Sequence, residues 1–258
     1  MAALVWRWLG AVVSALVVAV PTGPHPTDAT YLQFNMCGNL CNHGALDVVR
    51  NLEDTVSAER PAAVTLNEVC ENQYDQLRLD LPGFGGRFDP TGPHCDNGTR
   101  YGNAVLTRGS AADLVGSWPL PNPGGDEGRR LMCVRGRALV VCVTHVSFVA
   151  ANIAVQVDAV AGILRGLPAG APVLLGGDFN ADPADARMDP LYRTGSGALT
   201  EAGSRSRSST DADATFGRRK IDYIFLGHGG RRPGVRAAAV DAGRGRSDHR
   251  ALLASSGG

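Results

Sequence analysis

The sequence lacks a net charge, has a single lysine and contains few aromatic residues. Its 25 basic residues balance its 25 acidic residues, so the overall charge does not indicate a polyanionic or polycationic partner. Lys220 is the only lysine, and we attribute the excess of arginine to coding bias rather than to chemistry. Only 6% of the residues are aromatic, and no long apolar hairpin carries aromatic side chains. A protein that inserts such a hairpin into a bilayer is therefore not indicated.

The chain also lacks an apolar run long enough to cross a membrane as a stable helix. The longest run, residues 9–20, follows Arg7 and precedes a stretch rich in proline and threonine. About twelve apolar residues behind a basic residue are typical of a secretory signal peptide. We therefore expect residues 1–29 to be a signal peptide, cleaved near Ala19 or Ala29, and the mature protein to be secreted without a membrane span. An uncleaved anchor is the alternative.

The remaining residues, 30–258, are expected to form one domain. No internal repeat, linker or strongly biased segment divides them, and 44% of the whole chain is hydrophobic, which is enough for a substantial core. This length lies within the range that large α/β sandwiches occupy as one domain, so a single core is expected. We expect the mature protein to be a monomer.

Six cysteines agree with an oxidising compartment: Cys37, Cys41, Cys70, Cys95, Cys133 and Cys142. Six cysteines allow 15 pairings, and sequence alone does not choose among them. Local geometry favours a bridge between Cys133 and Cys142 across an expected hairpin. Cys37 and Cys41 lie in one short loop, which leaves Cys70 with Cys95. The rival interpretation is a metal site of Cys37, Cys41 and His43, but the ligand spacing of structural zinc sites is absent.

Strand and helix patterns alternate along the chain. The helical patterns cover residues 45–56 and 152–164. The strand patterns cover residues 31–36, 62–66, 102–107, 112–118, 131–134, 139–144, 172–175, 221–226 and 250–254. A polar stretch at residues 203–213 is expected to be a long loop near the functional site.

Five short polar motifs lie at the ends of apolar runs. They are Gln33-Phe34-Asn35, Leu66-Asn67-Glu68-Val69, Gly176-Gly177-Asp178-Phe179-Asn180, Lys220-Ile221-Asp222-Tyr223 and Ser247-Asp248-His249. A single acidic residue at a strand end is usually a turn or helix cap. Five such ends with complementary chemistry indicate instead that distant loops converge on one ligand at a sheet edge.

The side chains of these motifs suit the hydrolysis of a phosphate ester. Carboxylate and carboxamide oxygens can bind a hard divalent cation, amides can donate to phosphoryl oxygens, and an imidazole can transfer a proton. A carboxylate such as Asp222 beside His249 would fix the tautomer of the imidazole and raise its basicity. Glu68 and Asp248, from different loops, would each offer one or two oxygens to a metal.

The motifs resemble those of the endonuclease/exonuclease/phosphatase superfamily, which has the DNase I-like fold. The resemblance extends over residues 31–254 and includes the strand at residues 102–106 and the pair Thr144-His145. It implies an α/β (α+β) four-layer sandwich, in which two central mixed β-sheets are flanked by helices and the site lies at one edge.

The resemblance also implies a role for each residue. Glu68, helped by Asn35 and Asp248, would bind Mg²⁺, or Mn²⁺ or Ca²⁺ in its place. Asp178 would orient or deprotonate the attacking water, and Asn180 would contact the phosphoryl group. His249, paired with Asp222, would be the acid/base or stabilise the transition state, and His145 would be a second imidazole at the scissile phosphate.

Two stretches depart from the family pattern or match it loosely. Some nucleases of the family have an acidic residue two positions after the asparagine of the first motif, where this chain has Cys37. A second metal at that point is therefore not expected. Arg100, Tyr101 and Asn103 lie where related enzymes place substrate contacts, and we treat them as candidate substrate-binding residues.

The substrate is not fixed by these motifs, because members of the superfamily cleave nucleic acid, sphingomyelin, inositol phosphates and nucleotide-like molecules. Residues 201–258 contain ten arginines and Lys220 against six acidic residues, a net charge of +5. Arg205, Arg207, Arg218, Arg219 and Lys220 could attract a phosphate backbone. This favours nucleic acid, DNA or RNA, over a phospholipid or an inositol phosphate. A solvated surface and a non-catalytic binding module are the remaining alternatives.

Overall fold

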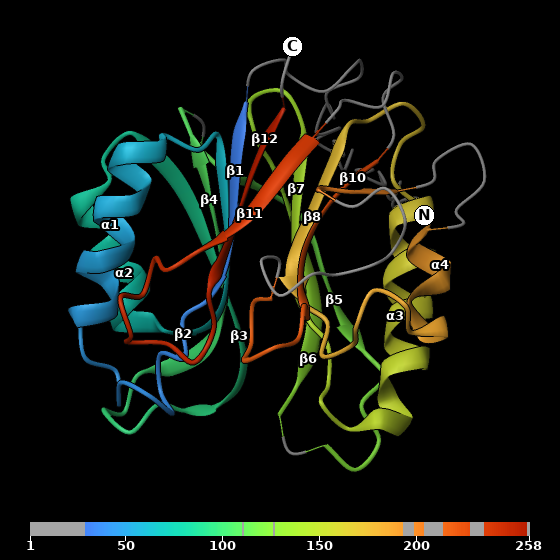
Figure 1. Cartoon of the computed structure of the whole chain (residues 1–258), viewed down its shortest axis with the longest axis horizontal. Helices are drawn as coiled ribbons and strands as arrows, with labels where there is room; N and C mark the ends of the chain where they lie inside the picture. The colour runs from blue at the N-terminus through green and yellow to red at the C-terminus, as the bar shows by residue number, and fades with distance from the viewer. Residues whose placement is uncertain are drawn as a thin grey trace, which may run out of the picture.

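The computed structural model describes residues 29–109, 111–125, 127–192, 199–203, 214–227 and 235–256. Two sheets of six strands each lie at its centre. In Figure 1, α1 and α2 lie on the outer side of one sheet and α3 and α4 on the outer side of the other. The expected four-layer sandwich with two mixed sheets is confirmed. The expected signal peptide lies outside the described residues, except for Ala29.

The first sheet has the strand order β11-β12-β1-β2-β4-β3. Its strands are β1 (Thr30–Asn35), β2 (Ala63–Cys70), β3 (Phe84–His94), β4 (Arg100–Arg108), β11 (Val235–Val240) and β12 (Ala251–Ser256). β1 and β2 are parallel, and the other neighbours are antiparallel. Two helices, α1 (Asp47–Glu59) and α2 (Glu71–Asp80), pack on this sheet through the core cluster that contains Val49, Leu52 and Leu77.

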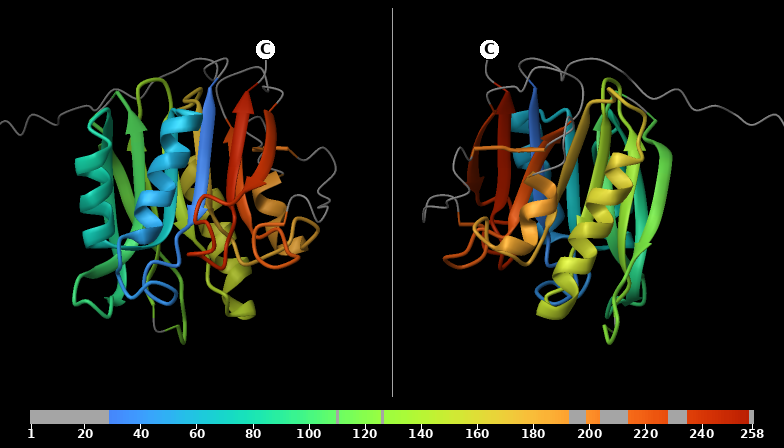
Figure 2. Two further views of the ribbon diagram at one scale, coloured as in Figure 1. Left: turned by 60° about the vertical axis from the view of Figure 1, so that its left-hand side comes forward. Right: turned by 90° about the vertical axis from the view of Figure 1, so that its right-hand side faces the viewer.

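The second sheet has the strand order β5-β6-β7-β8-β10-β9. Its strands are β5 (Asp113–Leu120), β6 (Arg129–Arg135), β7 (Val140–His145), β8 (Val173–Asp178), β9 (Thr200–Glu201) and β10 (Asp222–Gly227). β7 and β8 are parallel, and the other neighbours are antiparallel. Helix α3 (Ala150–Arg165), the 3₁₀ turn at Ala186–Met188 and α4 (Asp189–Tyr192) cover its outer face, as the right-hand view of Figure 2 shows.

Alternation along the central strands explains why the layers form. Val140 and Cys142 of β7 face the core beneath α3, whereas Val141 and Val143 face the core between the sheets. Because successive side chains of a strand point to opposite faces, a continuously apolar strand must be covered on both sides. Apolar strands flanked by two amphipathic helices therefore predict a buried sheet in this chain.

Close approach of the two sheets depends on glycine in β8. A Cβ atom at Gly176 would lie 2.0 Å from Oγ1 of Thr65 in the opposite sheet. Only glycine leaves room for Thr65 at this position. The Gly-Gly pair of the third motif is therefore a packing feature as well as the lead into Asp178.

Six elements were not expected from the sequence: β3, α2, the 3₁₀ turn at Ala186–Met188, α4, β9 and β11. Strand β3 carries Gly85, Gly86 and Pro90, which interrupt any alternating pattern, and it is held by its pairing with β4. Helix α2 has only two buried residues, Gln73 and Leu77, so its apolar stripe is too thin to recognise. Among the described residues, no helix is long and apolar enough to cross a membrane.

Candidate functional site

The polar motifs meet at one edge of the two sheets because of strand direction. The parallel pairs β1–β2 and β7–β8 both end at this edge, where β8 points downwards in Figure 1. Strand β10 is antiparallel to β8, so its first residue, Asp222, lies opposite Asp178, the last residue of β8. Likewise His249 precedes β12, which runs antiparallel to β1. Motifs up to about 200 residues apart in sequence are thereby brought together.

Glu68 is placed by an irregularity in β2. The register between β2 and β4 shifts between Leu66 and Val69, and Glu68 has a positive φ of 55°. A bulge of this kind redirects a side chain at the end of a strand, and a non-glycine residue in the left-handed region stores backbone strain. Asn180, with φ of 52°, shows the same conformation on the opposite side of the site. Such conformations cluster at functional sites.

The carboxamide of Asn35 joins two of the acidic residues. Its Nδ2 donates to Oε1 of Glu68 at 2.9 Å and to Oδ2 of Asp178 at 3.1 Å. Its Oδ1 accepts a hydrogen bond from the backbone N–H of Cys37 at 3.0 Å, which fixes the orientation of the amide. Asn35 is fully buried, so it links the two sheets at the base of the site.

His249 and Asp222 form the expected pair. Nδ1 of His249 lies 2.8 Å from Oδ2 of Asp222, and its Nε2 lies 3.7 Å from Oδ2 of Asp178. Burial by itself lowers the pKa of His249, but the charge of Asp222 and the hydrogen bond to it outweigh burial. With further contributions from Asp178 and Asp248, they raise the pKa of His249 to about 9. The imidazole is therefore held as a cation with Nε2 facing the site.

Asp178 and His145 are both buried, with opposite effects on their pKa values. Burial and then the charge of Asp222 raise the pKa of Asp178 to about 7, although His249, the Asn180 backbone and Asn35 act in the lowering direction. Burial, followed by the charges of Arg129 and His249, lowers the pKa of His145 well below its ordinary value. Asp178 can therefore exchange a proton near neutral pH, and His145 is a neutral imidazole.

A buried hydrogen-bond network supports these groups from below. Nε2 of Gln33 donates to Oδ1 of Asn67 at 2.7 Å and lies 3.4 Å from Oδ1 of Asp222. Oδ1 of Asn67 also accepts from the backbone N–H of Asp178 at 2.9 Å, and its Nδ2 donates to Oδ1 of Asn103 at 2.9 Å. Asn103 therefore supports the site from the interior instead of lining it, which differs from the expected substrate contact.

A cavity of about 370 Å³ opens above this network. Glu68, His145, Asp178, Asn180, Asp248 and His249 line it, as expected from the motifs. Tyr101, a candidate for substrate binding, lines it too. Burial, followed by the charges of Glu68 and Glu127, raises the pKa of Tyr101 well above its ordinary value, so its hydroxyl stays protonated.

Arg129 is a lining residue that the motifs did not reveal. Only 3% of the residue is exposed; its Nη2 pairs with Oε2 of Glu127 at 3.1 Å, while its Nε and Nη1 are buried without a hydrogen-bond partner. Buried guanidinium donors without partners are costly unless a ligand satisfies them. Burial raises the pKa of Glu127, the partner, to about 7. Arg129 is the first residue of β6, which runs antiparallel to β7 and therefore begins at the edge where the site lies. A polar residue at the start of such a strand is the sequence signal that could have identified it.

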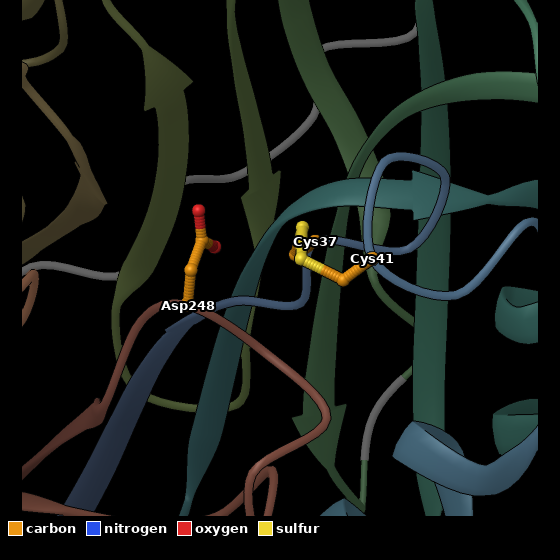
Figure 3. Close-up of side chains that lie close together, drawn as sticks. All are labelled: Cys37, Cys41 and Asp248. Atoms are coloured by element: carbon orange, nitrogen blue, oxygen red, sulfur yellow. A yellow bond between two sulfur atoms is a disulfide. The ribbon is translucent and has the colours of Figure 1, made fainter.

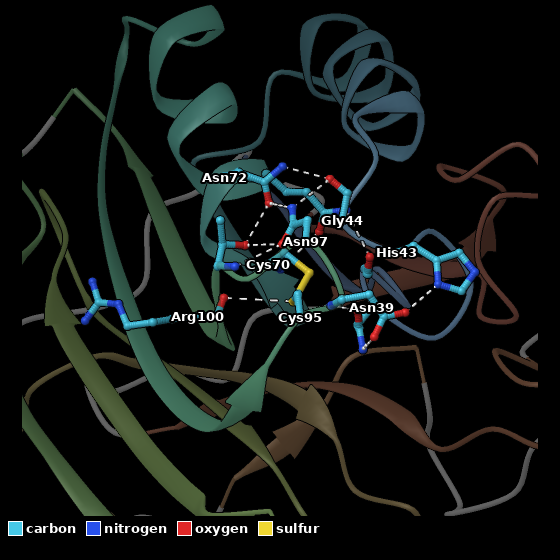
Figure 4. Close-up of a disulfide and its surroundings, with 12 residues drawn as sticks. Asn39, His43, Gly44, Cys70, Asn72, Cys95, Asn97 and Arg100 are labelled. Atoms are coloured by element: carbon cyan, nitrogen blue, oxygen red, sulfur yellow. Dashed lines mark hydrogen bonds and ion pairs between the residues drawn. A yellow bond between two sulfur atoms is a disulfide. The ribbon is translucent and has the colours of Figure 1, made fainter.

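Arg100 lies outside the cavity lining. Its Nε donates to Oε2 of Glu71 at 2.8 Å on the molecular surface. In Figure 4 its guanidinium points away from the Cys70–Cys95 bridge. The guanidinium of Arg100, which we expected to contact substrate, is thus paired with Glu71.

The arginine-rich segment is only partly a free basic surface. Lys220 is buried; its Nζ lies 2.9 Å from Oε1 of Glu201 and donates to the backbone oxygen of Asp222 at 3.0 Å. The expectation that Lys220 attracts phosphate is therefore wrong, because an acidic partner neutralises it inside the protein. Arg219 pairs with Asp182 at 3.2 Å on the surface. Arg205 and Arg207, with most of the expected loop at residues 203–213, lie outside the described residues.

All three favoured disulfides are present: Cys37–Cys41, Cys70–Cys95 and Cys133–Cys142. Cys133 and Cys142 are direct neighbours across β6 and β7. The rival metal site is wrong, because the two sulfurs are bonded to each other and His43 pairs with Asp96 at 2.6 Å. The Cys37–Cys41 bridge lies beside the carboxylate of Asp248, as Figure 3 shows.

The donor set at the base of the cavity fits a divalent cation. Ligand atoms of Glu68, His145 and Asp178 all lie within 4.8 Å of one another, and the carboxamide of Asn35 contacts both carboxylates. Oxygen-rich sites of this kind suit Mg²⁺, Mn²⁺ or Ca²⁺. Asp248 lines the same cavity, and its carboxylate lies within 4.8 Å of the Cys37 and Cys41 sulfurs.

Solved structures with the same fold include three of known identity. D. rerio TDP2 complexed with a single-strand DNA product superposes with a TM-score of 0.69 at 17% identity, over 89% of this chain and 99% of that chain. The human Nocturnin catalytic domain with bound sulfate gives 0.67 at 20% identity, over 88% and 93% of the two chains. An endonuclease/exonuclease/phosphatase from Bacteroides vulgatus gives 0.66 at 18% identity, over 89% and 98%.

None of the curated protein sequences compared with this chain is similar enough to count as a match. The sequence model of the Endonuclease/Exonuclease/phosphatase family matches residues 32–249. That span begins before Asn35 and ends at His249, so it contains every motif whose side chains meet at the cavity. The fold, the site and this match together show that the chain belongs to the endonuclease/exonuclease/phosphatase family.

Proposed function

We propose that this protein is a secreted, divalent-metal-dependent phosphodiesterase that hydrolyses nucleic acid. The observation that carries the proposal is one cavity lined by Glu68, Asp178, His249 and Arg129, in which Asn35 and Asp222 orient the first three by hydrogen bonds from behind and Nε and Nη1 of Arg129 have no partner. Carboxylates and imidazoles can transfer protons during the attack of water, and a guanidinium can bind an anionic phosphate.

The residues have complementary roles in this reaction. Asp178, whose pKa is raised to about 7, orients the attacking water and accepts its proton. His249, held as a cation by Asp222, stabilises the negative charge that develops on the phosphoryl oxygens or protonates the leaving oxygen. Asn180, whose Nδ2 donates to the backbone oxygen of Val146 at 2.9 Å, contacts the phosphoryl group with its remaining capacity.

Glu68, with Asp248, would hold the cation, and Asn35 would help by orienting the carboxylate of Glu68 through its Nδ2. A bound divalent ion would polarise the phosphoryl oxygens and stabilise charge in the transition state. His145, neutral and buried with an unpartnered Nδ1, lies between this cluster and Asn180. It is suited to accept or donate a hydrogen bond at the scissile phosphate.

Nucleic acid is favoured over the alternatives by the recognition chemistry. The TDP2 neighbour was solved with a single-strand DNA product and the Nocturnin neighbour with sulfate, a tetrahedral anion. Arg129 has two N–H donors, on Nε and Nη1, that no protein group satisfies and that phosphate oxygens could accept from. The alternative is the same chemistry on sphingomyelin, another phospholipid, or an inositol phosphate. Three disulfides agree with the expected export.

A parallel substrate panel tests the proposal. Purified protein is incubated with DNA, RNA, sphingomyelin and phosphoinositides, each with Mg²⁺ and each with EDTA. We expect hydrolysis of DNA or RNA that EDTA abolishes. Turnover of sphingomyelin or a phosphoinositide alone would identify the alternative function. Undiminished hydrolysis in EDTA would contradict the metal dependence.

A further inference from the structure

Exposed apolar side chains gather at the mouth of the catalytic cavity. Six large hydrophobic side chains are exposed among the described residues, and three of them line this cavity: Leu40, Phe148 and Phe216. Leu40 is 76% exposed and Phe148 74% exposed. Single exposed apolar residues are common on protein surfaces, but a group of them around one pocket indicates a binding surface.

Leu40 is held in the solvent by a tightly fastened loop. The loop is closed by the Cys37–Cys41 bridge, and Nδ2 of Asn42 donates to the backbone oxygens of Cys37 and Arg246 at 2.9 Å and 2.7 Å. Asn39 accepts a hydrogen bond from the backbone N–H of Asp96 at 2.8 Å (Figure 4). The Cys70–Cys95 bridge in turn fastens the loop that contains Asp96. The chain is thus fastened on both sides of Leu40, in the conformation that exposes its side chain.

Phe148 is presented from the opposite wall in a similarly ordered way. It follows β7 and precedes α3, in a turn where Ser147 donates its backbone N–H to Oε1 of Gln156 at 2.7 Å. Oγ of Ser147 accepts from the backbone N–H of Val149 at 3.1 Å. These bonds fix the backbone next to Phe148, whose side chain lines the cavity and is mostly exposed. The two walls of the cavity therefore each carry one fixed, exposed apolar side chain.

The same cavity also contains charged side chains: four acidic ones, Glu68, Glu127, Asp178 and Asp248, and the guanidinium of Arg129. Nε and Nη1 of Arg129 are buried there without partners. A ligand that contacts both the exposed apolar side chains and the free donors of Arg129 has an anionic group joined to a flat apolar group. A nucleotide whose base is unstacked has this chemistry, whereas the bases of a duplex are stacked and paired and present only the backbone.

We propose that Leu40 and Phe148 form a binding site for an unstacked nucleobase next to the scissile phosphate, so that the enzyme selects single-stranded nucleic acid. This inference rests on the proposed function and gives it a substrate class. The ring of Phe148 stacks on the base, and Leu40 contacts the nucleotide from the other wall. Stacking of a base on an aromatic side chain tolerates all base identities, so little sequence preference is expected.

Binding in EDTA tests the site independently of hydrolysis. A single-stranded oligonucleotide containing 2-aminopurine is titrated with protein, and fluorescence and anisotropy are recorded. We expect Phe148→Ser and Leu40→Ser to weaken single-strand binding by roughly 5- to 100-fold. Binding of the corresponding duplex should change less than about twofold. Leu79→Ser is the matched control, because Leu79 is 74% exposed but lies outside the cavity.

Two further variants separate a base from a lipid chain. Phe148→Trp should retain single-strand binding and Phe148→Leu should lose it, since a leucine cannot stack. Retained oligonucleotide binding by Phe148→Leu, equal losses on single strand and duplex, or an effect of Leu79→Ser equal to that of Leu40→Ser would each overturn the inference. Loss of binding to sphingomyelin vesicles with unchanged oligonucleotide binding would overturn it in favour of a lipid. Absence of nucleic-acid hydrolysis in the panel above would reject the proposed function itself.

Discussion

The side chain of Asn67, in the first sheet, accepts a hydrogen bond at 2.9 Å from the backbone N–H of Asp178, in the second sheet. Asn67 is fully buried, and its carboxamide also bonds Gln33 and Asn103. One side chain thus fixes the position of a catalytic candidate relative to the opposite half of the molecule.

Replacement of Asn67 by leucine should therefore affect stability and activity together. The change leaves the Asp178 N–H and Oδ1 of Asn103 without their hydrogen bonds to Asn67 in the interior, at about 1–3 kcal/mol for each group. We expect a loss of roughly 3 kcal/mol in the free energy of unfolding, measured by urea denaturation, and reduced turnover. Asn51→Leu is the control, because half-buried Asn51 makes one side-chain bond, to the oxygen of Gly243. A smaller loss for Asn67→Leu than for Asn51→Leu would contradict the supporting role.

Glu68→Gln tests the cation site. The substitution removes one negative charge while it keeps the size of the side chain and its place at the bulge. We expect hydrolysis of any accepted phosphodiester to fall by roughly two orders of magnitude or more, with an unchanged melting temperature. Initial rates over a range of Mg²⁺ concentrations check this. Near-normal turnover at low Mg²⁺ would remove Glu68 from the site.

Arg129→Met tests recognition of the phosphate. Hydrogen bonds to charged groups contribute about 1.5–3 kcal/mol, so kcat/KM for an oligonucleotide should fall by roughly 10- to 100-fold. Arg129→Lys keeps the charge but not the fork and should lose less. The neighbouring Arg130, whose Nε donates to Oγ of Ser117 at 2.9 Å outside the cavity, supplies the control Arg130→Met. Equal losses in both methionine variants would indicate a structural effect.

The disulfides should stabilise the protein to different degrees. Cys70–Cys95 spans 25 residues and Cys37–Cys41 only 4. Loop-closure entropy then predicts that the free energy of unfolding falls by about 3.5 kcal/mol in the double variant Cys70→Ala/Cys95→Ala. In Cys37→Ala/Cys41→Ala it should fall by about 2 kcal/mol. Urea denaturation measures both. Thiol titration of the denatured, unreduced wild-type protein should find no free thiol, and two or more per chain would contradict the disulfide pairing.

The raised pKa of Glu53, a residue away from the site, predicts that the stability of the protein depends on pH. Burial, then its contact with Asp80 and the charges of Asp80 and Asp54, raise the pKa of Glu53 to about 7, against the lowering effect of Arg50. Between the unfolded pKa of about 4.5 and the folded pKa of about 7, Glu53 binds more protons in the folded state than in the unfolded state. The free energy of unfolding therefore falls as the pH rises through this range. Relative to wild type, Glu53→Gln should gain melting temperature from pH 5 to pH 8. Glu59→Gln, at an exposed position of the same helix, is the control.

Much of the architecture follows from local pattern. The apolar runs of β1, β2, β7, β8 and β10 and the amphipathic stripes of α1 and α3 indicate a buried, layered sheet, because side-chain periodicity reports which faces are covered. A hairpin between Cys133 and Cys142 places these residues opposite each other by its own geometry, so this bridge is a local property as well. The order in which strands end in polar motifs can be read from the sequence without tertiary information.

The sequence by itself therefore determined the layers, the strands that carry the catalytic candidates and the short-range disulfides. Tertiary structure decided the rest: the placement of Arg129 in the cavity, the burial of Lys220 against Glu201, and the position of Asn103 beneath the site instead of in it. The physical reason is that periodicity describes one element at a time. Which charged side chain is buried, and against what partner, depends on the register between strands and on loops that are distant in sequence.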